Sequence, residues 1–328
     1  MDLAPTPSFL EGHSPPVPML ATLGAIYGAL AVGTVVAGVA RARKGDAAKE
    51  LWQRCVSWWW MITAAAAALL IGPIGVLILF AFVSYLALQE FLSIIPSRKE
   101  DRLIILLAYL VIPANALLVW ANLYGIFLIF IPVYVFVIFP FLLVMAGQVK
   151  RFLNFTGALH WGTVLTVYNI SYVPYLMILP KAGSPVGGAG LVLALLLLTE
   201  LNDVAQYISG KLIGGPKIVP NVSPKKTWAG FVGGVVATTA VSAFLTPFLT
   251  PFDTGLSILV GFVIAVAGFA GDVAMSAIKR DLGLKDTSAL IPGHGGILDR
   301  IDSLTFTAPL YFHILIFFCF AGYSGSGF

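Results

Sequence analysis

Acidic and basic side chains gather in one segment near the C-terminal end of the sequence. Residues 276–303 contain the bases and acids Lys279, Arg280, Lys285, Arg300, Asp281, Asp286, Asp299 and Asp302. Asp299 and Asp302 are three residues apart, so they share one face if this part is helical. Two carboxylates at that spacing can share a divalent cation while Lys and Arg hold phosphates. Because the segment offers oxygen ligands and no cysteine, it favours Mg²⁺.

A glycine-rich turn lies within the same segment. Residues 292–296 read PGHGG, and the glycines let backbone N–H groups approach an anion closely. His294 either caps this turn or contacts a substrate, and both readings stay open. A salt-bridged connector would also carry acids and bases in equal numbers. The glycine turn combined with paired acids and paired bases favours a site for metal and phosphate.

A carboxylate inside an apolar run precedes this segment. Asp272 lies two helical turns before the end of its run, and a carboxylate near mid-membrane costs about 2.5–3.5 kcal/mol. Such a group therefore faces other helices, water or a metal. Ser276 follows four residues later and shares the Asp272 face of a helix. Together they open toward a basic loop and suit a cation and a phosphate.

A second basic loop ends just before another apolar run. Its last residues are Ser223, Pro224, Lys225, Lys226 and Thr227. A helix that begins after them would offer free N–H groups and a positive dipole end to an anion. The alternative is ordinary positive charge beside a membrane, which we favour for Lys211 and Lys217.

Two further polar positions lie near the ends of apolar runs. Glu200, Asn202 and Asp203 form either a polar helix end or a water-accessible pocket, and the sequence leaves both open. Glu90 lies about one turn from the end of its run, so we expect it to reach the membrane interface.

The elements that must position these residues are membrane spans. The chain has 328 residues, of which 59% are hydrophobic and 10% charged, whereas soluble domains carry about 25% charged residues. Apolar runs long enough to cross a bilayer predict about ten helical spans, at residues 19–40, 56–72, 74–95, 103–121, 124–146, 157–179, 188–207, 228–250, 255–278 and 303–323.

Threading ten spans alternately sorts the positive charge to one side. All Lys and Arg residues except Lys181 fall in segments on that side, namely 41–55, 96–102, 147–156, 208–227 and 279–302. Because Lys and Arg collect on the cytoplasmic side, the catalytic loops are expected there. The sequence thus predicts an all-α polytopic bundle, with transmembrane helices over residues 1–180 and a catalytic transmembrane region over 181–328. Basic residues confined to short loops argue against nucleic-acid binding.

The segment from Ser276 to Asp302 resembles the signature of the phosphatidate cytidylyltransferases, also called CDP-diacylglycerol synthases. The fixed positions of that signature correspond to Ser276, Lys279, Arg280, Lys285, Asp286, Pro292, His294, Gly295, Gly296, Asp299, Arg300 and Asp302. Residues 223–227 and the region of Asp203 also resemble that family. The resemblance covers about residues 195–305; the first 180 residues resemble the family only as a series of spans.

The resemblance implies the reaction CTP + phosphatidate → CDP-diacylglycerol + pyrophosphate, with Mg²⁺ required. It also implies a homodimer and a two-cation site, with K⁺ a candidate for the second cation. The metal ligands would be Asp272 and Asp299, with Asp302 a further candidate. The predicted catalytic residues are Asp272, Asp299, Ser276, Lys279, Arg280 and Asp302. The predicted substrate-binding residues are Ser223, Lys225, Lys226, Thr227, Asp203, Lys285, His294 and Arg300.

Three other functions are alternatives to this one. A degenerate family member with a scaffold role is disfavoured by the complete signature. A membrane transporter of an anionic solute would spread polar residues along a path across several spans, whereas here they crowd at one side. A CDP-alcohol phosphotransferase would carry a spaced Asp-Gly-x-x-Ala-Arg pattern, which the sequence lacks. The favoured expectation is an integral enzyme of a bacterial inner membrane whose active site faces the cytoplasm.

Overall fold

The described part of the computed structural model is helical. It comprises residues 16–45, 49–96, 101–147, 150–179, 185–288, 290, 291, 293 and 295–320. Within these residues the β pairings are two isolated bridges, Lys217 with Thr227 and Ile291 with Gly295. The predicted all-α class is therefore confirmed. The helices are α1 (Val17–Lys44), α2 (Lys49–Ile71), α3 (Pro73–Ile94), α4 (Arg102–Trp120), α5 (Tyr124–Ile129), η3 (Phe130–Val135), α6 (Phe136–Met145), α7 (Phe152–Thr163), η4 (Val164–Tyr168), α8 (Asn169–Leu176), α9 (Gly188–Leu212), α10 (Trp228–Leu249), α11 (Thr254–Asp281), α12 (Leu298–Ile301) and α13 (Leu304–Cys319).

Nine helical segments of the described chain are long and apolar enough to cross a membrane. Each of them corresponds to one of the predicted spans. Two of them join several elements: α5, η3 and α6 form Tyr124–Met145, and α12 and α13 form Leu298–Cys319. The chain is therefore a multi-pass integral membrane protein.

The remaining predicted span, 157–179, is a helical run built from α7, η4 and α8. It is more polar than the other nine, and its C-terminal part, η4 and α8, is covered by protein, whereas Leu153 and Trp161 of α7 are exposed. Tyr172, Val173, Tyr175 and Leu176 are each at most 1% exposed, and α8 packs against α3, α4, α9 and α13. A helix that neighbouring helices cover does not need an apolar surface for lipid.

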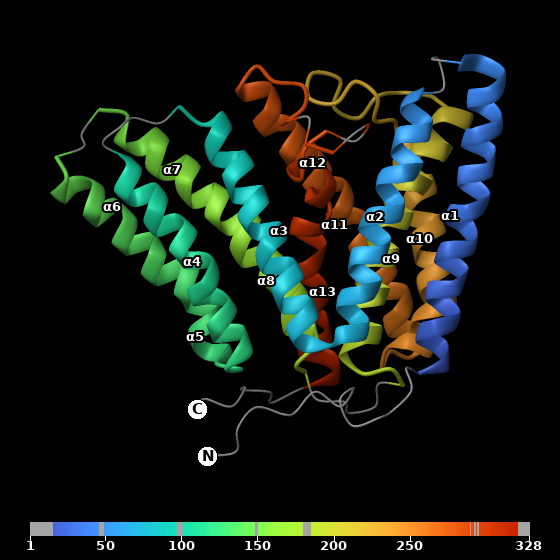
Figure 1. The fold of residues 1–328 in the computed structure, drawn as a ribbon, viewed down its shortest axis with the longest axis horizontal. Helices are drawn as coiled ribbons and strands as arrows, with labels where there is room; N and C mark the ends of the chain where they lie inside the picture. Colours follow the sequence, from blue (N-terminus) through green and yellow to red (C-terminus); the bar gives the residue numbers. More distant parts are fainter. Residues whose placement is uncertain are drawn as a thin grey trace.

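The spans form one bundle, in which the N-terminal helix α1 and the helices α4 to α6 lie on opposite flanks (Figure 1). Figure 1 shows α4, α5 and α6 at one flank, α1 and α10 toward the other, and α11 and α13 between them. Helices α9, α10, α11 and α13 pack against one another in succession. This group contains Glu200 and Asp203 in α9 and Asp272 in α11, and Asp299 and Asp302 lie shortly before α13.

The helix ends that border the basic segments lie at one edge of the bundle. The upper edge in Figure 1 carries the α9–α10 and α11–α12 connections together with the ends of α1, α3 and α6. The opposite edge carries the α2–α3, α4–α5 and α10–α11 turns. At that edge Asp253 caps α11, because its Oδ1 accepts a hydrogen bond of 2.7 Å from the Leu256 N–H. This arrangement agrees with the predicted alternating threading.

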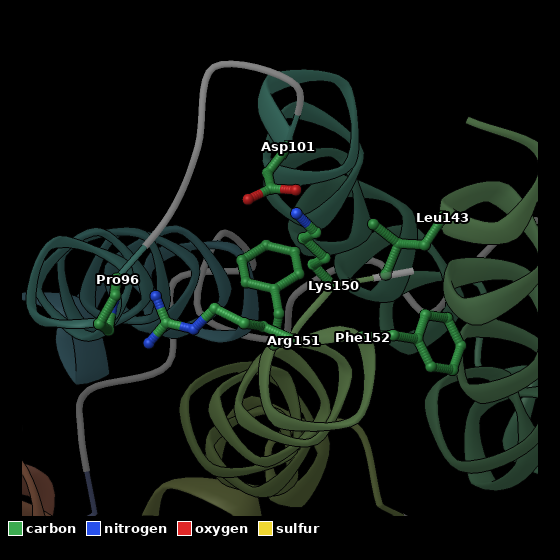
Figure 2. Close-up of a pocket in the computed structure, with 7 residues that line it drawn as sticks. Pro96, Asp101, Leu143, Lys150, Arg151 and Phe152 are labelled. Atoms are coloured by element: carbon green, nitrogen blue, oxygen red, sulfur yellow. The ribbon is translucent and has the colours of Figure 1, made fainter. Parts of the chain in front are cut away.

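A small cavity at the basic edge lies among the ends of α3, α4, α6 and α7. Its volume is about 20 Å³, which is room for about one water molecule. Figure 2 shows the Lys150 side chain extending toward the Asp101 carboxylate and the Arg151 side chain extending toward Pro96. The cavity is too small for a nucleotide or a lipid headgroup, so it belongs to the packing of these helix ends.

Candidate active site

A cavity of about 1000 Å³ opens among the ends of α2, α9, α11 and α12. Most of its lining residues are charged or polar. The charged ones are Glu50, Arg54, Glu200, Asp203, Lys225, Asp272, Lys279, Lys285, Asp286, Asp299, Arg300 and Asp302. The two carboxylates proposed as metal ligands, Asp272 of α11 and Asp299 of α12, thus line the same cavity.

Asp272 is half-buried and has both a cation and a hydroxyl as partners. Lys226 Nζ lies 2.5 Å from Asp272 Oδ2, and Ser276 Oγ donates to Asp272 Oδ1 at 3.4 Å. The Ser276 contact follows from the four-residue spacing, which puts both side chains on one helix face. Lys226 also donates to Gln206 Oε1 at 3.2 Å. The loop before α10 is therefore tied to both α9 and α11.

Asp299 is buried, and both of its oxygens have partners. Lys279 Nζ lies 2.6 Å from Asp299 Oδ1, and the two side chains are 12% and 8% exposed. Asp299 Oδ2 accepts hydrogen bonds from the Thr287 N–H at 3.2 Å, the Thr287 hydroxyl at 2.9 Å and the Gly296 N–H at 3.1 Å. A buried carboxylate that is paired and accepts this many bonds holds its surroundings in one geometry. Asp299 therefore organises the loop between α11 and α12.

The glycine turn is held from a second side by Glu90 of α3. Glu90 Oε2 accepts from the Ile297 N–H at 2.7 Å and from the Leu298 N–H at 3.3 Å. A side chain on Gly296 would collide with Glu90 Oε1, so only glycine permits this approach. The expectation that Glu90 reaches the membrane interface is wrong, because the residue is only 7% exposed and caps the start of α12.

A second group of acids faces the cavity beside Asp272. Asp302 lies within electrostatic reach of Asp272, Asp203 and Arg300, and Glu200 lies within reach of Asp203 and Arg300. Asp203 Oδ2 accepts a 2.9 Å hydrogen bond from the Ser303 hydroxyl. Asp203 Oδ1 and Arg300 Nε are buried without a hydrogen-bond partner among the described residues. Buried polar atoms without partners are costly, so this group is suited to a polar ligand.

Asn202 has a packing role beside these acids. Its amide donates to the Ala265 carbonyl at 3.2 Å and accepts from the Thr238 hydroxyl at 3.4 Å, and the residue is 0% exposed. The polar helix end and the water-accessible pocket that the sequence left open are thus both present: Asn202 joins α9 to α10 and α11, whereas Glu200 and Asp203 line the cavity.

The remaining predicted residues divide into two groups. Lys225 and Lys285 line the cavity. Arg280 is exposed and joins two loops instead, because it donates to the carbonyls of Val222 and Leu284. Thr227 is buried as the N-cap of α10, and its Oγ1 accepts from the Gly230 N–H at 3.1 Å.

For two of the predicted residues, Ser223 and His294, no position at the cavity is described. Ser223 is half-buried in the turn before α10, where its carbonyl accepts from the Lys226 N–H at 3.2 Å. His294 lies outside the described residues.

Helix α2 supplies cavity residues that the sequence did not single out. Glu50, Gln53, Arg54 and Trp58 line the cavity together with the acids of α9, α11 and α12. Arg54 Nε donates to the Gly293 carbonyl at 3.0 Å and thereby holds the glycine turn. The spacing of these residues, three or four apart, is the signal of one helix face. The sequence could reveal that face but not which distant turn it meets.

The residues of the cavity fit a divalent cation bound together with an anionic substrate. The acids in the lining outnumber the cations, and Asp203 Oδ1 is a buried oxygen without a partner among the described residues. Carboxylate oxygens are the ligands that Mg²⁺ prefers. In the part of the chain that the structure describes, no three acidic, His or Cys side chains already converge as a complete metal site. Asp203 and Asp302 are the acids that could hold a cation with the least rearrangement, because Asp203 Oδ1 has no partner among the described residues and Asp302 accepts a single bond, at Oδ1 from the Ser303 N–H. Asp272 and Asp299 would each have to exchange a lysine partner for the cation.

Comparison with known proteins gives a family match over most of the chain. Residues 52–318 match the model of the family described as the cytidylyltransferase family. That range includes the residues that line the cavity except Glu50 at the start of α2.

Similar proteins fall into two groups. An uncharacterized protein, YnbB, of Escherichia coli is 44% identical over 241 residues, which cover 74% of this chain and 79% of YnbB. A phosphatidate cytidylyltransferase of Mycobacterium leprae is 35% identical over 145 residues, 42% of this chain and 45% of that protein. A phosphatidate cytidylyltransferase of Haemophilus influenzae is 39% identical over 138 residues, 40% of this chain and 48% of that protein. The alignments with proteins of known activity thus span less than half of those proteins.

Proposed function

The chain belongs to the cytidylyltransferase family, and on that premise we propose that it is a phosphatidate cytidylyltransferase. It would join CTP to phosphatidate and release pyrophosphate, as part of phospholipid biosynthesis. The observation that carries this proposal is the shared cavity, in which Asp272 of α11 pairs with Lys226 of the loop before α10 and Asp299 of α12 pairs with Lys279 of α11. The named activity of the partial relatives supports the choice of lipid acceptor.

The reaction is a nucleotidyl transfer at the α-phosphorus of CTP. A phosphate oxygen of phosphatidate attacks that phosphorus, the bond to the β-phosphate oxygen breaks, and pyrophosphate leaves. The attacking oxygen is already anionic, so the protein needs to bring two polyanions together and stabilise the charge that develops. A general base is not required.

The lysines of the cavity are placed for this task. Lys226 and Lys279 are half-buried beside carboxylates, and Lys225 and Lys285 are exposed at the cavity lining. We assign all four to the triphosphate of CTP and to the leaving pyrophosphate. Arg300 is assigned to the lipid phosphate, because its guanidinium has a buried Nε without a partner among the described residues and is suited to phosphate geometry.

The acids of the cavity would hold a divalent cation, for which we propose Mg²⁺. Asp272, Asp203 and Asp302 are the candidate ligands, with Asp299 as the group that orders the loop or completes the site. When bound, the cation would neutralise phosphate charge at the transferring group. A second cation, with K⁺ the candidate, would balance the remaining carboxylates.

The setting of the enzyme is proposed on the same basis. The edge with the basic segments would face the cytoplasm by the positive-inside rule, in a bacterial inner membrane where CTP is available on that side. A homodimer is proposed from the family resemblance. The transporter alternative gains no support, because most ionisable residues of the cavity come from the start of α2, the loop before α10 and the end of α11 with the loop and helix that follow it. Glu200, Asp203 and Asp272 lie deeper, within α9 and α11.

An assay with the purified full chain tests the proposed function. CTP, phosphatidate and Mg²⁺ should give CDP-diacylglycerol and pyrophosphate in equal amounts, and excess chelator should stop the reaction. Mass spectrometry of the extracted lipid identifies the product. Diacylglycerol and phosphatidylglycerol serve as control acceptors, because neither offers the terminal phosphate that attacks. Turnover of a control acceptor in place of phosphatidate would refute the proposal.

A further inference from the structure

Helix α2 separates the catalytic cavity from a second cavity. Glu50, Arg54 and Trp58, spaced four residues apart, line the catalytic cavity. Trp52, Val56 and Trp60, also four apart, line the second one, and Gln53 lines both. Residues four apart lie on one helix face, whereas residues two apart, such as Glu50 and Trp52, point about 200° apart. The two cavities therefore lie on roughly opposite faces of α2, and Gln53 lies on the face between them.

The second cavity is a groove of about 500 Å³ between α1 and α2. Its cations are Arg41 at the end of α1 and Lys49 at the start of α2, both exposed. The guanidinium of Arg41 lies 5.6 Å from the centre of the Trp52 ring, which is within cation–π range. Trp60 is 75% exposed on the outside of the bundle. We call this feature the α1–α2 groove.

The composition of the α1–α2 groove matches a phospholipid headgroup. Two cations suit a phosphate, and Trp side chains lie at the level of lipid headgroups in membrane proteins. The ends of α1 and α2 that form the groove lie at the basic edge of the bundle, on its outer flank (Figure 1). A lipid in the surrounding bilayer can therefore reach the groove without entering the protein.

Charge distinguishes the groove from the catalytic cavity. Among its described lining residues the groove contains cations and no acid, whereas acids outnumber cations in the catalytic cavity. A phosphate that arrives alone is therefore attracted to the groove and repelled by the cavity until cations are bound there. The groove also lies partly outside the family match, which begins at residue 52, because α1 and Lys49 precede that residue.

From this geometry we infer that the α1–α2 groove docks the phosphate headgroup of phosphatidate before the lipid enters the catalytic cavity past Gln53. This inference rests on the proposed function for the identity of the lipid. Arg41 and Lys49 bind the phosphate, and Trp52 and Trp60 hold the headgroup at the membrane surface.

The affinity of the full chain for phosphatidate tests the inference, because lipid binding can be measured without the catalytic reaction. Native mass spectrometry measures the Kd of added phosphatidate for the unmodified protein and for the double variant Arg41→Gln/Lys49→Gln. Each cation beside a lipid surface contributes about 1 kcal/mol, so the Kd should rise about tenfold or more. Phosphatidylcholine, which is neutral overall, should bind both proteins equally.

Arg43→Gln is the matched control variant. Arg43 is exposed on the same helix, two residues from Arg41, and does not line the groove. Arg43→Gln removes the same charge from the same helix end, but Arg43 does not line the groove, and the Kd for phosphatidate should therefore stay unchanged. An equal loss of affinity in Arg43→Gln, or no loss in the double variant, would overturn the inference. Binding of inorganic phosphate alone as tightly as phosphatidate would overturn the assignment to a lipid headgroup.

Kinetics then separate this inference from the proposed function. In the double variant the KM for phosphatidate should rise about tenfold, while kcat and the KM for CTP stay unchanged. A rise in the KM for CTP instead would contradict a docking role. If the unmodified chain shows no CTP-dependent turnover, the proposed function fails, and the binding comparison still decides whether the groove holds the lipid.

Discussion

At the scale of residues, two carboxylates hold three consecutive backbone N–H groups. Asp299 accepts from Gly296, and Glu90 accepts from Ile297 and Leu298. Glu90 belongs to α3, far from the turn in sequence. The turn that precedes α12 is thus fixed by one acid from its own helix and one from a distant helix.

Loss of the Glu90 carboxylate should loosen this turn. In Glu90→Ala the Ile297 and Leu298 N–H groups lose a buried charged acceptor, at a cost of about 3 kcal/mol for two such bonds. Hydrogen-exchange mass spectrometry should show faster exchange of the peptide over residues 290–301, and the Tm in detergent should fall. Glu90→Gln keeps one carbonyl acceptor, so its exchange rate and Tm should lie between those of Glu90→Ala and those of the unmodified protein. Unchanged exchange in Glu90→Ala would rule out the capping role.

A methyl group at Gly296 should have a related effect on activity. The new Cβ in Gly296→Ala would collide with Glu90 Oε1, so either Glu90 or the turn must move. Displacement of catalytic groups by about 1 Å can cost roughly 100-fold in rate, so CTP turnover should fall by about that factor. Gly157→Ala is the control, because a Cβ there meets no atom within 4 Å. Normal turnover in Gly296→Ala would show that the turn need not be fixed.

The sequence identified most of these residues but not their partners. The spacing of Asp272 and Ser276 correctly predicts a shared face, because both belong to one helix. The contact of Glu90 with the turn depends on how α3 packs against α12, and no local pattern encodes that packing. The same reason explains why the position of Arg54 beside Gly293 was not foreseen.

At the scale of elements, α9, α10 and α11 form the frame beneath the cavity. Asn202 links all three through the Ala265 carbonyl and the Thr238 hydroxyl. Polar side chains that bond across buried helices stabilise such packing. The frame carries Asp203 and Asp272 at its upper end, so its integrity sets the distance between them.

Asn202→Ala should therefore weaken the frame more than it changes substrate binding. It removes two interhelical hydrogen bonds, each contributing about 0.6 kcal/mol on average in a membrane protein. The Tm in detergent should fall, while the KM for CTP changes less than twofold. Thr239→Val on α10 is the control, because the Thr239 hydroxyl has no partner among the described residues. A lower Tm in the control but not in Asn202→Ala would contradict this role.

Apolar run length predicted the spans well, because crossing a bilayer imposes a minimum length on each helix. The prediction was least complete for residues 157–179, where the helical run carries a π-helical stretch, η4, and where η4 and α8 are covered by other helices. Run length alone does not distinguish a helix that faces lipid from one that faces protein.

At the scale of the whole molecule, charge sorting orients the bundle. The structure gathers the helix ends beside the basic segments at one edge, and the positive-inside rule assigns that edge to the cytoplasm. The catalytic cavity would then receive CTP from the cytoplasm and phosphatidate from the adjacent leaflet.

Labelling of single introduced cysteines measures this orientation. Lys217→Cys at the basic edge and Thr254→Cys at the opposite edge are both exposed positions. A membrane-impermeant maleimide should label the first only in inside-out vesicles and the second only in spheroplasts. Both experiments use a background in which Cys55 and Cys319 are replaced by Ser. The reverse pattern would place the cavity outside the cytoplasm, away from CTP.

The central claim is that acids from α11 and α12 form one catalytic site, and Asp272→Asn and Asp299→Asn test it most directly. Each variant of the purified chain is compared with Asp253→Asn, in which Asn can still cap α11 at the opposite edge. The claim predicts that both cavity variants lose at least about 100-fold in CTP- and phosphatidate-dependent pyrophosphate release. Both variants should still insert and fold, with a lower Tm for Asp299→Asn because Lys279 loses its buried carboxylate partner, and Asp253→Asn should remain active. Near-normal turnover in Asp272→Asn or in Asp299→Asn would contradict it.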